Sequence, residues 1–485
     1  MGSSDEVRWL DLAEPRTSPY ATNATVDGLI TSLDRQRVVL HFAGGPLDRN
    51  AMASSMGDVA EAYGGAGAHS LFVLQSGGLR ETLTRNLPHV LREAVFEIVL
   101  KRVLLCVLGK AAERSVPGAR GRSRSGNLPV PSPHRVAVEL NSMEKDGVEP
   151  YASLTPPTGM SRLTDAESQW LARTLSQDQQ LRSLGRSASA TDSELLMSLT
   201  RAETPGATEG RHSSRTGLEV ATGLLVRKVV NAARAVIERF RTGTHHGLYP
   251  TAVEEILREF CLTHLGAALW SGMKNEAATA FRSDEGSPAG VGRYFLDRFI
   301  EAVAVPERKD VTVVGHGSGT PLMNAFLAAF DARRGSADSP LPADFRIRNV
   351  VALAPMCTFP ELASTLRRRN TAFEHFRLFA LTDEAEKADH LVPVAYPRSL
   401  LYFVSGVLER DANGMSAAVP LSGMARWYDS GQVVGGPEAE EVRAVADAEP
   451  SAFVRSPGAE CGARSHAQFR ADPALLANLQ LMISG

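Results

Sequence analysis

Short apolar runs alternate with amphipathic stretches in two separate parts of the chain. In the N-terminal part, apolar runs at 37–40 and 70–74 flank a helical pattern at 51–63. In the C-terminal part, runs rich in β-branched and aromatic residues lie at 311–314, 345–353, 376–381 and 452–455, with amphipathic stretches between them. Strands that alternate with helices along a chain are typical of α/β proteins. The pattern therefore predicts an α/β fold with a mostly parallel central sheet and flanking helices.

The middle of the chain has helical patterns without strand patterns between them. Apolar residues recur at helical spacing over 217–241 and 251–271, and Thr164 and Thr191 each open a capping-box sequence. The stretch 111–135 is rich in Gly, Pro, Ser and Arg, which is typical of a surface loop. These patterns predict an irregular N-terminal arm at 1–33, an α/β core at 34–110 and 286–485, and a largely helical insertion with flexible loops at 111–285.

A glycine-rich turn follows the apolar run at 311–314. Residues 315–319 read Gly-His-Gly-Ser-Gly, and an amphipathic stretch continues from there to 330. A strand, a sharp turn and a helix are the context of a nucleophile elbow, whose motif is Gly-x-Ser-x-Gly. The stretch resembles the elbow of the α/β-hydrolase superfamily of serine esterases and lipases. Gly317, however, occupies the position of the nucleophilic serine, and Ser318 comes one place later.

Glycine accepts the strained backbone of an elbow at no steric cost, so Gly317 is expected to keep the turn while removing the hydroxyl. Ser318 is a poor substitute, because in this family the residue after the nucleophile contributes its backbone N–H and its side chain leaves in another direction. Two explanations stay open. Either a serine was altered to glycine in this sequence, or the chain is a natural pseudoenzyme.

The resemblance implies that an acid and then a histidine follow the nucleophile along the chain. The acid is expected after the run at 376–381, where Asp389 stands in an Asp-x-x-Val-Pro sequence similar to the one around the family's acid. Asp383 lies closer to the end of that run and is the second candidate, and Glu386 is the third. His466 is the one histidine after the last apolar run and is expected to be the general base.

A second glycine-rich sequence, His-Phe-Ala-Gly-Gly at 41–45, follows the run at 37–40. Small residues directly after a buried strand let the backbone approach a ligand closely. In the α/β-hydrolase family this position carries half of the oxyanion hole. The resemblance therefore implies that the N–H of Ala43 or Gly44 acts together with the N–H of Ser318.

Other reactive residues are expected to have structural roles. Cys357 ends an apolar run, where a buried thiol is more often packed than nucleophilic. His41, His316 and His390 are expected near the site in supporting positions. The histidine pair at 245–246 and the four cysteines lie in no metal-ligand spacing, so neither a metal nor a cofactor is expected.

Composition changes this picture little. The chain has 485 residues, of which 43% are hydrophobic and 22% charged, and its net charge of −3 favours neither nucleic acid nor a membrane surface as a partner. The N-terminus lacks the basic and apolar segments of a signal peptide. The most apolar long stretch, 94–109, contains three charged residues and is too short to span a bilayer. Widely spaced cysteines suit a reducing compartment, so we expect a cytoplasmic protein.

The first functional hypothesis is a serine-hydrolase scaffold that acts on a carboxylic ester, thioester or amide and is disarmed by Gly317. Its partner would be a small acyl substrate or a peptide. The alternative is a binding or signalling module whose pocket was never catalytic, with a protein partner bound through the helical insertion. In related hydrolases such insertions often form caps or lids, and a purely structural subdomain is equally compatible with the pattern.

Overall fold

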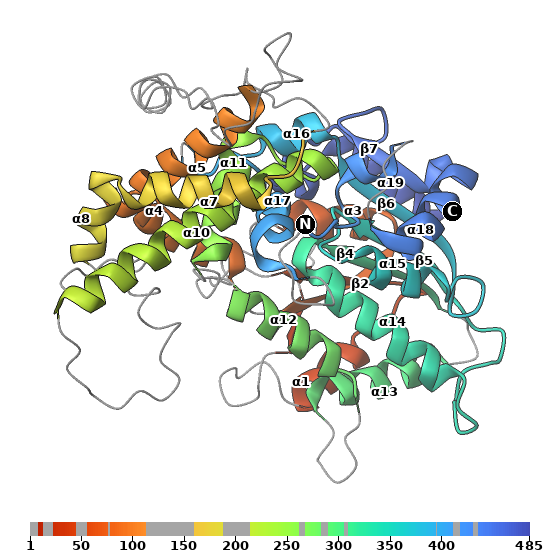
Figure 1. Ribbon diagram of the computed structural model, residues 1–485. Helices are drawn as coiled ribbons and strands as arrows, with labels where there is room; N and C mark the ends of the chain where they lie inside the picture. Colours follow the sequence, from red (N-terminus) through yellow and green to blue (C-terminus); the bar gives the residue numbers. More distant parts are fainter. Residues whose placement is uncertain are drawn as a thin grey trace. The chain divides into compact units, whose positions relative to one another are not determined.

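Figure 1 shows a computed structural model of the protein. The chain forms two compact units. The first, the sheet unit, consists of Met1–Glu81, Leu269–Asp389 and Pro420–Gly485, and the second, the helical unit, of Thr82–Ala268 and His390–Val419. The structure describes residues 8–12, 23–44, 56–75, 78–112, 160–187, 214–260, 267–282, 290–304, 309–393, 395–410, 418–429 and 435–485, with the backbone alone at 214–219 and 267.

The described strands form one seven-stranded sheet in the order β1-β3-β2-β4-β5-β6-β7, and every neighbouring pair is parallel. The strands are β1 Trp9–Asp11, β2 Arg37–Gly44, β3 Ala68–Gln75, β4 Asp310–His316, β5 Ile347–Leu353, β6 Phe373–Leu381 and β7 Phe453–Ser456. The central strands are apolar along most of their length because helices cover both faces of the sheet. The predicted α/β fold with flanking helices is confirmed.

Helices of the sheet unit form two layers. They are α1 Asn23–Thr31, α3 Gly57–Gly65, α12 Ala267–Thr279, α13 Val291–Val303, α14 Thr320–Arg334, α15 Phe359–Leu366, α16 Asp383–Ala388, α18 Gly436–Ala448 and α19 Pro473–Ser484. Val39 and Ala43 of β2 pack in one core cluster with residues of α3 and α19. Phe42, which points to the other face, has its ring 5.2 Å from that of Phe326 in α14. Alternation along the strand thus separates the two layers.

The chain reverses its direction across the sheet between β2 and β4. From β2 it passes through α3 to β3, toward the β1 edge, whereas from β4 it passes through α14 to β5, toward the β7 edge. Right-handed crossovers that run in opposite directions place their helices on opposite faces, as α3 and α14 are placed here. Ligands of open parallel sheets bind beyond the carboxyl ends of the strands at such a reversal. The fold therefore favours a site near the ends of β2 and β4.

The helical unit is built around its longest helix. Its helices are α4 Leu79–Leu91 (which begins in the sheet unit), α5 Ala94–Ala112, α7 Asp165–Ser176, α8 Gln179–Ser187, α10 Ser214–Thr242, α11 Leu248–Glu259 and α17 Leu400–Phe403. Helix α10 packs against α5, α7, α8 and α11. Because α5 packs on α10, the unit begins well before residue 111, where the sequence places the insertion. It also includes the later segment His390–Val419.

The capping box predicted at Thr164 is present. Its hydroxyl accepts the N–H of Glu167, and its own N–H donates to the Glu167 carboxylate at 2.7 Å. The capping box predicted at Thr191, and all but the first two residues of the loop predicted at 111–135, lie outside the described residues. Among the helices that the structure describes, none has the length and apolar character needed to cross a bilayer.

The stretch 1–33, predicted to be irregular, contains β1 and α1. Strand β1 is three residues long, and the ring of Trp9 lies 4.9 Å from that of Phe72 in the neighbouring strand β3. Helix α1 packs on α13, where the Tyr294 hydroxyl donates to the carboxylate of Asp27 at 2.9 Å. Both elements depend on partners far away in the sequence, and β1 is too short to show a periodic pattern.

Glycine at 319 is required by the close approach of the β4–α14 turn to the end of β2. A Cβ on Gly319 would overlap the carbonyl of Phe42 and lie 2.7 Å from the nitrogen of Ala43. We predict that Gly319→Ala destabilises the sheet unit by about 1–3 kcal/mol, as overpacking in a core does. Hydrogen exchange of the β2 and β4 amides measures this loss for the sheet unit separately.

The matched control is Gly335→Ala at the other end of α14. A Cβ there would lie 3.4 Å from its nearest neighbour, an ordinary contact. We expect a change within about 0.5 kcal/mol for this variant. Equal losses of stability in Gly319→Ala and Gly335→Ala would contradict the conclusion that the β4–α14 turn requires glycine at 319.

Candidate active site

Gly317 forms the tip of a tight turn between β4 and α14. Its φ of +54° lies in the left-handed region, and the 3₁₀ helix Gly317–Gly319 leads directly into α14. The carbonyl of Gly317 accepts the N–H of Met356 at 3.2 Å. A Cβ built on Gly317 would meet only the Cε of Met356, at 3.9 Å, among the described atoms. The position thus has room for a side chain, which would be held in a strained backbone conformation.

Ser318 points toward the end of β2. A Cβ on Gly44 would overlap the Oγ of Ser318, so the hydroxyl lies against the Gly44 backbone. The N–H of Ser318 belongs to the first turn of a helix, where amide groups have no acceptor within the helix. Parallel register places Ala43 opposite His316, so the backbones that follow β2 and β4 lie at the same edge of the sheet. The residues predicted for the oxyanion hole, Ala43, Gly44 and Ser318, are therefore close neighbours.

His466 lies in the 3₁₀ helix His466–Arg470, after β7, and is bound by two carboxylates. Its Nε2 lies 3.0 Å and 3.2 Å from the two carboxylate oxygens of Glu386. Its backbone N–H donates to Oδ2 of Asp389 at 2.9 Å. All three residues are buried, with relative exposures of 8% for His466, 1% for Glu386 and 9% for Asp389.

The carboxylate that meets the histidine ring is therefore Glu386, which the sequence ranks third. Asp389, the favoured candidate, binds the backbone of His466 and not its ring. Asp383, the second candidate, pairs with Lys387 at 2.6 Å and with Arg426 at 3.5 Å. The reason is helical geometry. Glu386 lies on the buried side of α16, whereas Asp389 caps the end of that helix in an extended conformation.

Burial disfavours the charged form of His466, but the charge and hydrogen bond of Glu386 overcome it, so the pKa of His466 is raised above its usual value. The histidines at the ends of β2 and β4 behave in the opposite way. Burial, helped by the charge of Arg470, lowers the pKa of His41 to about 3 and holds that of His316 well below its usual value. These two rings stay neutral, since no carboxylate among the described residues compensates for their burial.

The remaining sequence candidates have other surroundings. Nδ1 of His41 lies 2.9 Å from the hydroxyl of Tyr63, and its ring is 6.0 Å from that of His316. His390 is exposed and begins the second segment of the helical unit. Burial raises the pKa of Cys357 to about 12, and its sulfur lies 3.1 Å from Oγ of Ser422, so this thiol is packed and unreactive near neutral pH. Among the described residues, no group of three or more His, Cys, Asp or Glu side chains could hold a metal.

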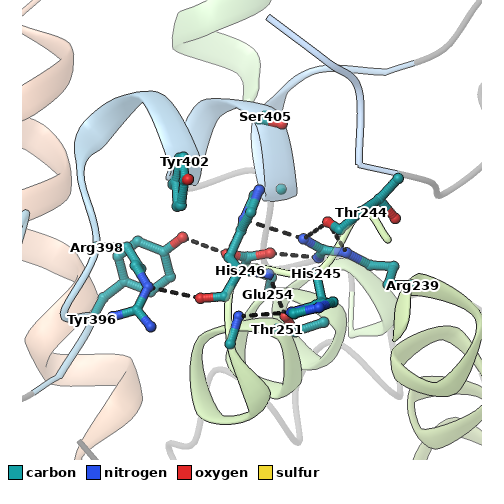
Figure 2. Close-up of polar contacts among 12 residues, drawn as sticks. Arg239, Thr244, His245, His246, Thr251, Glu254, Tyr396, Arg398, Tyr402 and Ser405 are labelled. Atoms are coloured by element: carbon teal, nitrogen blue, oxygen red, sulfur yellow. Dashed lines mark hydrogen bonds and ion pairs between the residues drawn. The ribbon is translucent and has the colours of Figure 1, made fainter. Parts of the chain in front are cut away.

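A second polar cluster lies inside the helical unit (Figure 2). Glu254 of α11 is fully buried and accepts hydrogen bonds from Arg239 of α10 and from the hydroxyl of Tyr396. Its Oε1 also lies 2.9 Å from Nδ1 of His246. Arg398 donates to the carbonyl of His246 at 2.7 Å. The cluster therefore ties the segment that contains Tyr396 and Arg398 to the main part of the helical unit.

The Glu254 carboxylate lies close to the backbone of Gly406, which is possible because glycine has no side chain. A Cβ on Gly406 would overlap the Glu254 carboxylate, and Gly406 lies in the π-helical turn Val404–Leu408. The sequence indicates only that the histidine pair at 245–246 lies in no metal-ligand spacing, and its pattern does not single out Glu254. A signal was present, because a glutamate among the apolar positions of an amphipathic helix must find partners when it is buried. This cluster has a structural role, since Glu254 joins Arg239 of α10 to Tyr396 of the later segment inside the helical unit.

Comparison with protein-family models gave no match, and comparisons with curated proteins and with solved structures gave none either. The fold, the turn at Gly317 and the contacts of His466 are therefore the features that bear on function.

We predict that Glu254→Gln destabilises the helical unit by about 3 kcal/mol near pH 7, the low end for a broken buried ion pair, because Glu255 stays beside the buried guanidinium of Arg239 at 3.0 Å. Chemical denaturation followed by hydrogen exchange of the α10 and α11 amides measures the loss. The control is Glu238→Gln, which removes a partly exposed carboxylate that pairs with Arg162 and Arg241. We expect about 0–1 kcal/mol for this control, and a similar loss in both variants would argue against a special role for Glu254.

The same cluster predicts a dependence on pH. Burial opposes ionisation of Glu254, but Arg239 and His246 outweigh it and lower the pKa to about 2 from an ordinary 4.5. A carboxylate with a lowered pKa stabilises the fold above its unfolded value and loses that contribution as the pH falls. The difference in stability between the wild type and Glu254→Gln should therefore shrink between pH 4.5 and pH 2. A difference in stability that stays constant between pH 4.5 and pH 2 would contradict the lowered pKa of Glu254.

Proposed function

We propose that the sheet unit is the scaffold of an α/β-type serine hydrolase in which Gly317 occupies the position of the nucleophile. One observation carries the proposal. The turn with positive φ at Gly317 and the buried Glu386–His466 pair come from segments in the chain order nucleophile, acid, histidine, each at the carboxyl end of a parallel strand. This order and this placement are those of the family that the sequence resembles.

In a form with serine at 317, Nδ1 of His466, the ring nitrogen that does not face Glu386, would accept the proton of the serine hydroxyl as that oxygen attacks the carbonyl carbon of an ester, thioester or amide. Glu386 would stabilise the imidazolium that forms, which agrees with the raised pKa of His466. The N–H groups of Ser318 and of Ala43 or Gly44 would bind the oxyanion, at about 3 kcal/mol for each donor. The imidazolium would then protonate the leaving group as its bond to the carbonyl carbon breaks, which leaves the acyl group on the serine oxygen. Water, deprotonated by His466, would attack this acyl group, and the imidazolium would return the proton to the serine oxygen as the carboxylic acid leaves.

The chain as it stands lacks the hydroxyl that begins this sequence. Ser318 does not replace it, because its side chain lies on Gly44. We therefore propose that the protein retains the binding and oxyanion elements of a hydrolase and turns over very slowly or not at all. A carboxylic ester, a thioester or an amide would be bound without a cofactor, and a reducing cytoplasmic setting suits its buried free cysteines.

The second candidate is a binding or signalling module, and Gly317 itself favours it. The close contacts that shape the turn, Gly319 on Phe42 and Ser318 on Gly44, are all kept although the nucleophile is missing. A site formed by this turn and the end of β2, without a nucleophilic hydroxyl, could bind an acyl compound or a peptide and release it unchanged. The helical unit would then offer a surface for a protein partner.

We predict that Gly317→Ser restores reaction with a fluorophosphonate probe and raises the hydrolysis of short acyl esters by about 10³–10⁶-fold. The wild type should remain unlabelled, because no other hydroxyl lies at the tip of the turn. Labelling is measured by intact-mass spectrometry, and peptide mapping must place the adduct on residue 317.

Two further variants serve as controls in the Gly317→Ser background. His466→Ala should abolish labelling, since the base is lost, whereas Ser318→Ala should leave it largely intact, since only the N–H of residue 318 takes part. Equal labelling of the wild type and Gly317→Ser would refute the hydrolase proposal. No labelling of a folded Gly317→Ser protein would favour the binding module.

A further inference from the structure

We propose that Asp389 is a positioning residue for His466, which fixes the backbone of the 3₁₀ helix His466–Arg470 so that Glu386 can orient the imidazole ring. The proposal rests on the hydrolase function proposed above but is tested without it. It assigns the two carboxylates at the end of β6 to separate tasks. Glu386 acts on the ring, and Asp389 acts on the main chain.

The two carboxylates come from one short element. Glu386 belongs to α16, and Asp389 is the residue that ends this helix. Their contacts with His466 are 3.0 Å to the ring nitrogen and 2.9 Å to the backbone N–H. Because both are carried by the same rigid turn of chain, the distance between their carboxylates is nearly fixed. His466 is therefore held at two points at once, and the ring keeps little freedom to rotate away.

Asp389 also acts as the N-terminal cap of the 3₁₀ helix, because it accepts the hydrogen bond of the helix's first N–H. Ser465, which precedes the 3₁₀ helix, makes no capping hydrogen bond through its side chain. The first amide of a helix has no acceptor within the helix, and at His466 this amide is buried. The Asp389 carboxylate supplies the acceptor from a residue 77 positions earlier in the chain. Without it, a buried N–H would lose its partner, and the start of the helix would be free to shift.

A shift of the helix start is expected to change the rate supported by a general base more than it changes the stability of the fold. A catalytic group must be held to within about 0.5 Å of its working position, and a displacement of about 1 Å can cost about 100-fold in rate. Loss of a single helix cap, by contrast, lowers the stability of a folded domain only modestly. Asp389 is therefore expected to affect the state of His466 far more than it affects the fold.

The test is a pH titration of His466 by NMR in protein labelled with ¹³C-histidine, in which His466→Gln identifies the resonance. In the wild type we expect one sharp ring signal. Glu386→Gln should lower the pKa of His466, since it removes the carboxylate on the ring. Asp389→Ala should lower the pKa and also broaden or split the ring signal, because the ring then samples several positions.

Asp389→Asn separates position from charge. Its amide oxygen can still accept the His466 N–H, so the ring signal should stay single and sharp, although the loss of a negative charge lowers the pKa slightly. The matched structural control is Asp472→Ala. Asp472 anchors the same C-terminal loop by accepting the N–H of Gly462 at 2.9 Å and caps α19. It should reduce the melting temperature and leave the titration of His466 unchanged.

Two results would overturn the proposal. In the first, Asp389→Ala and Asp389→Asn give the same pKa and the same sharp signal, which would mean that only the charge of Asp389 matters. In the second, Asp389→Ala behaves like Asp472→Ala, which would mean that its role is merely structural. In the Gly317→Ser background, Asp389→Ala should also slow probe labelling by about 10–100-fold, and Asp472→Ala should not. If that background never labels, the titration still decides the role of Asp389.

Discussion

The contact between the β4–α14 turn and the end of β2 constrains the whole candidate site. Gly319 lies on the carbonyl of Phe42, Ser318 lies on Gly44, and a Cβ on Gly315 would approach Sδ of Met323 to 2.7 Å. Glycine is needed at 319 because backbone atoms of β2 leave no space for a side chain, whereas at 44 and 315 the nearest atoms belong to the side chains of Ser318 and Met323. Gly317 differs, since space is available and only the backbone angle favours glycine. A position where a side chain fits but is strained is what a nucleophile elbow requires.

The sequence predicts the part of the site that depends on local geometry. The turn at Gly317, the helix after it and the strand before it follow from the order of apolar, glycine and amphipathic residues between 311 and 330. The same local reasoning predicts that Ser318 turns away, because successive residues in a tight turn cannot point in one direction. The position of His466 is predictable for a different reason, since it is the one histidine that follows the last strand.

Which carboxylate meets the ring of His466 could not be predicted, because it depends on which side of a six-residue helix faces the core. Asp383, Glu386 and Asp389 are spaced by three residues and all follow β6. Only the packing of α16 buries Glu386 and leaves Asp383 beside Lys387 and Arg426. The short strand β1 and the helix α1 escape prediction for a related reason. Their stability comes from β3 and α13, which lie elsewhere in the sequence.

The two buried carboxylate–histidine pairs in the described part of the chain differ in how many donors share the carboxylate. Glu254 binds Arg239 and Tyr396 as well as His246, so its charge is balanced and its oxygens are occupied. Glu386 has His466 as its one described hydrogen-bonding partner through the side chain, and its charge therefore acts mainly on that ring. A carboxylate shared among several donors resists any change of protonation. One that faces a single imidazole raises the proton affinity of that ring, which is the property that a general base needs.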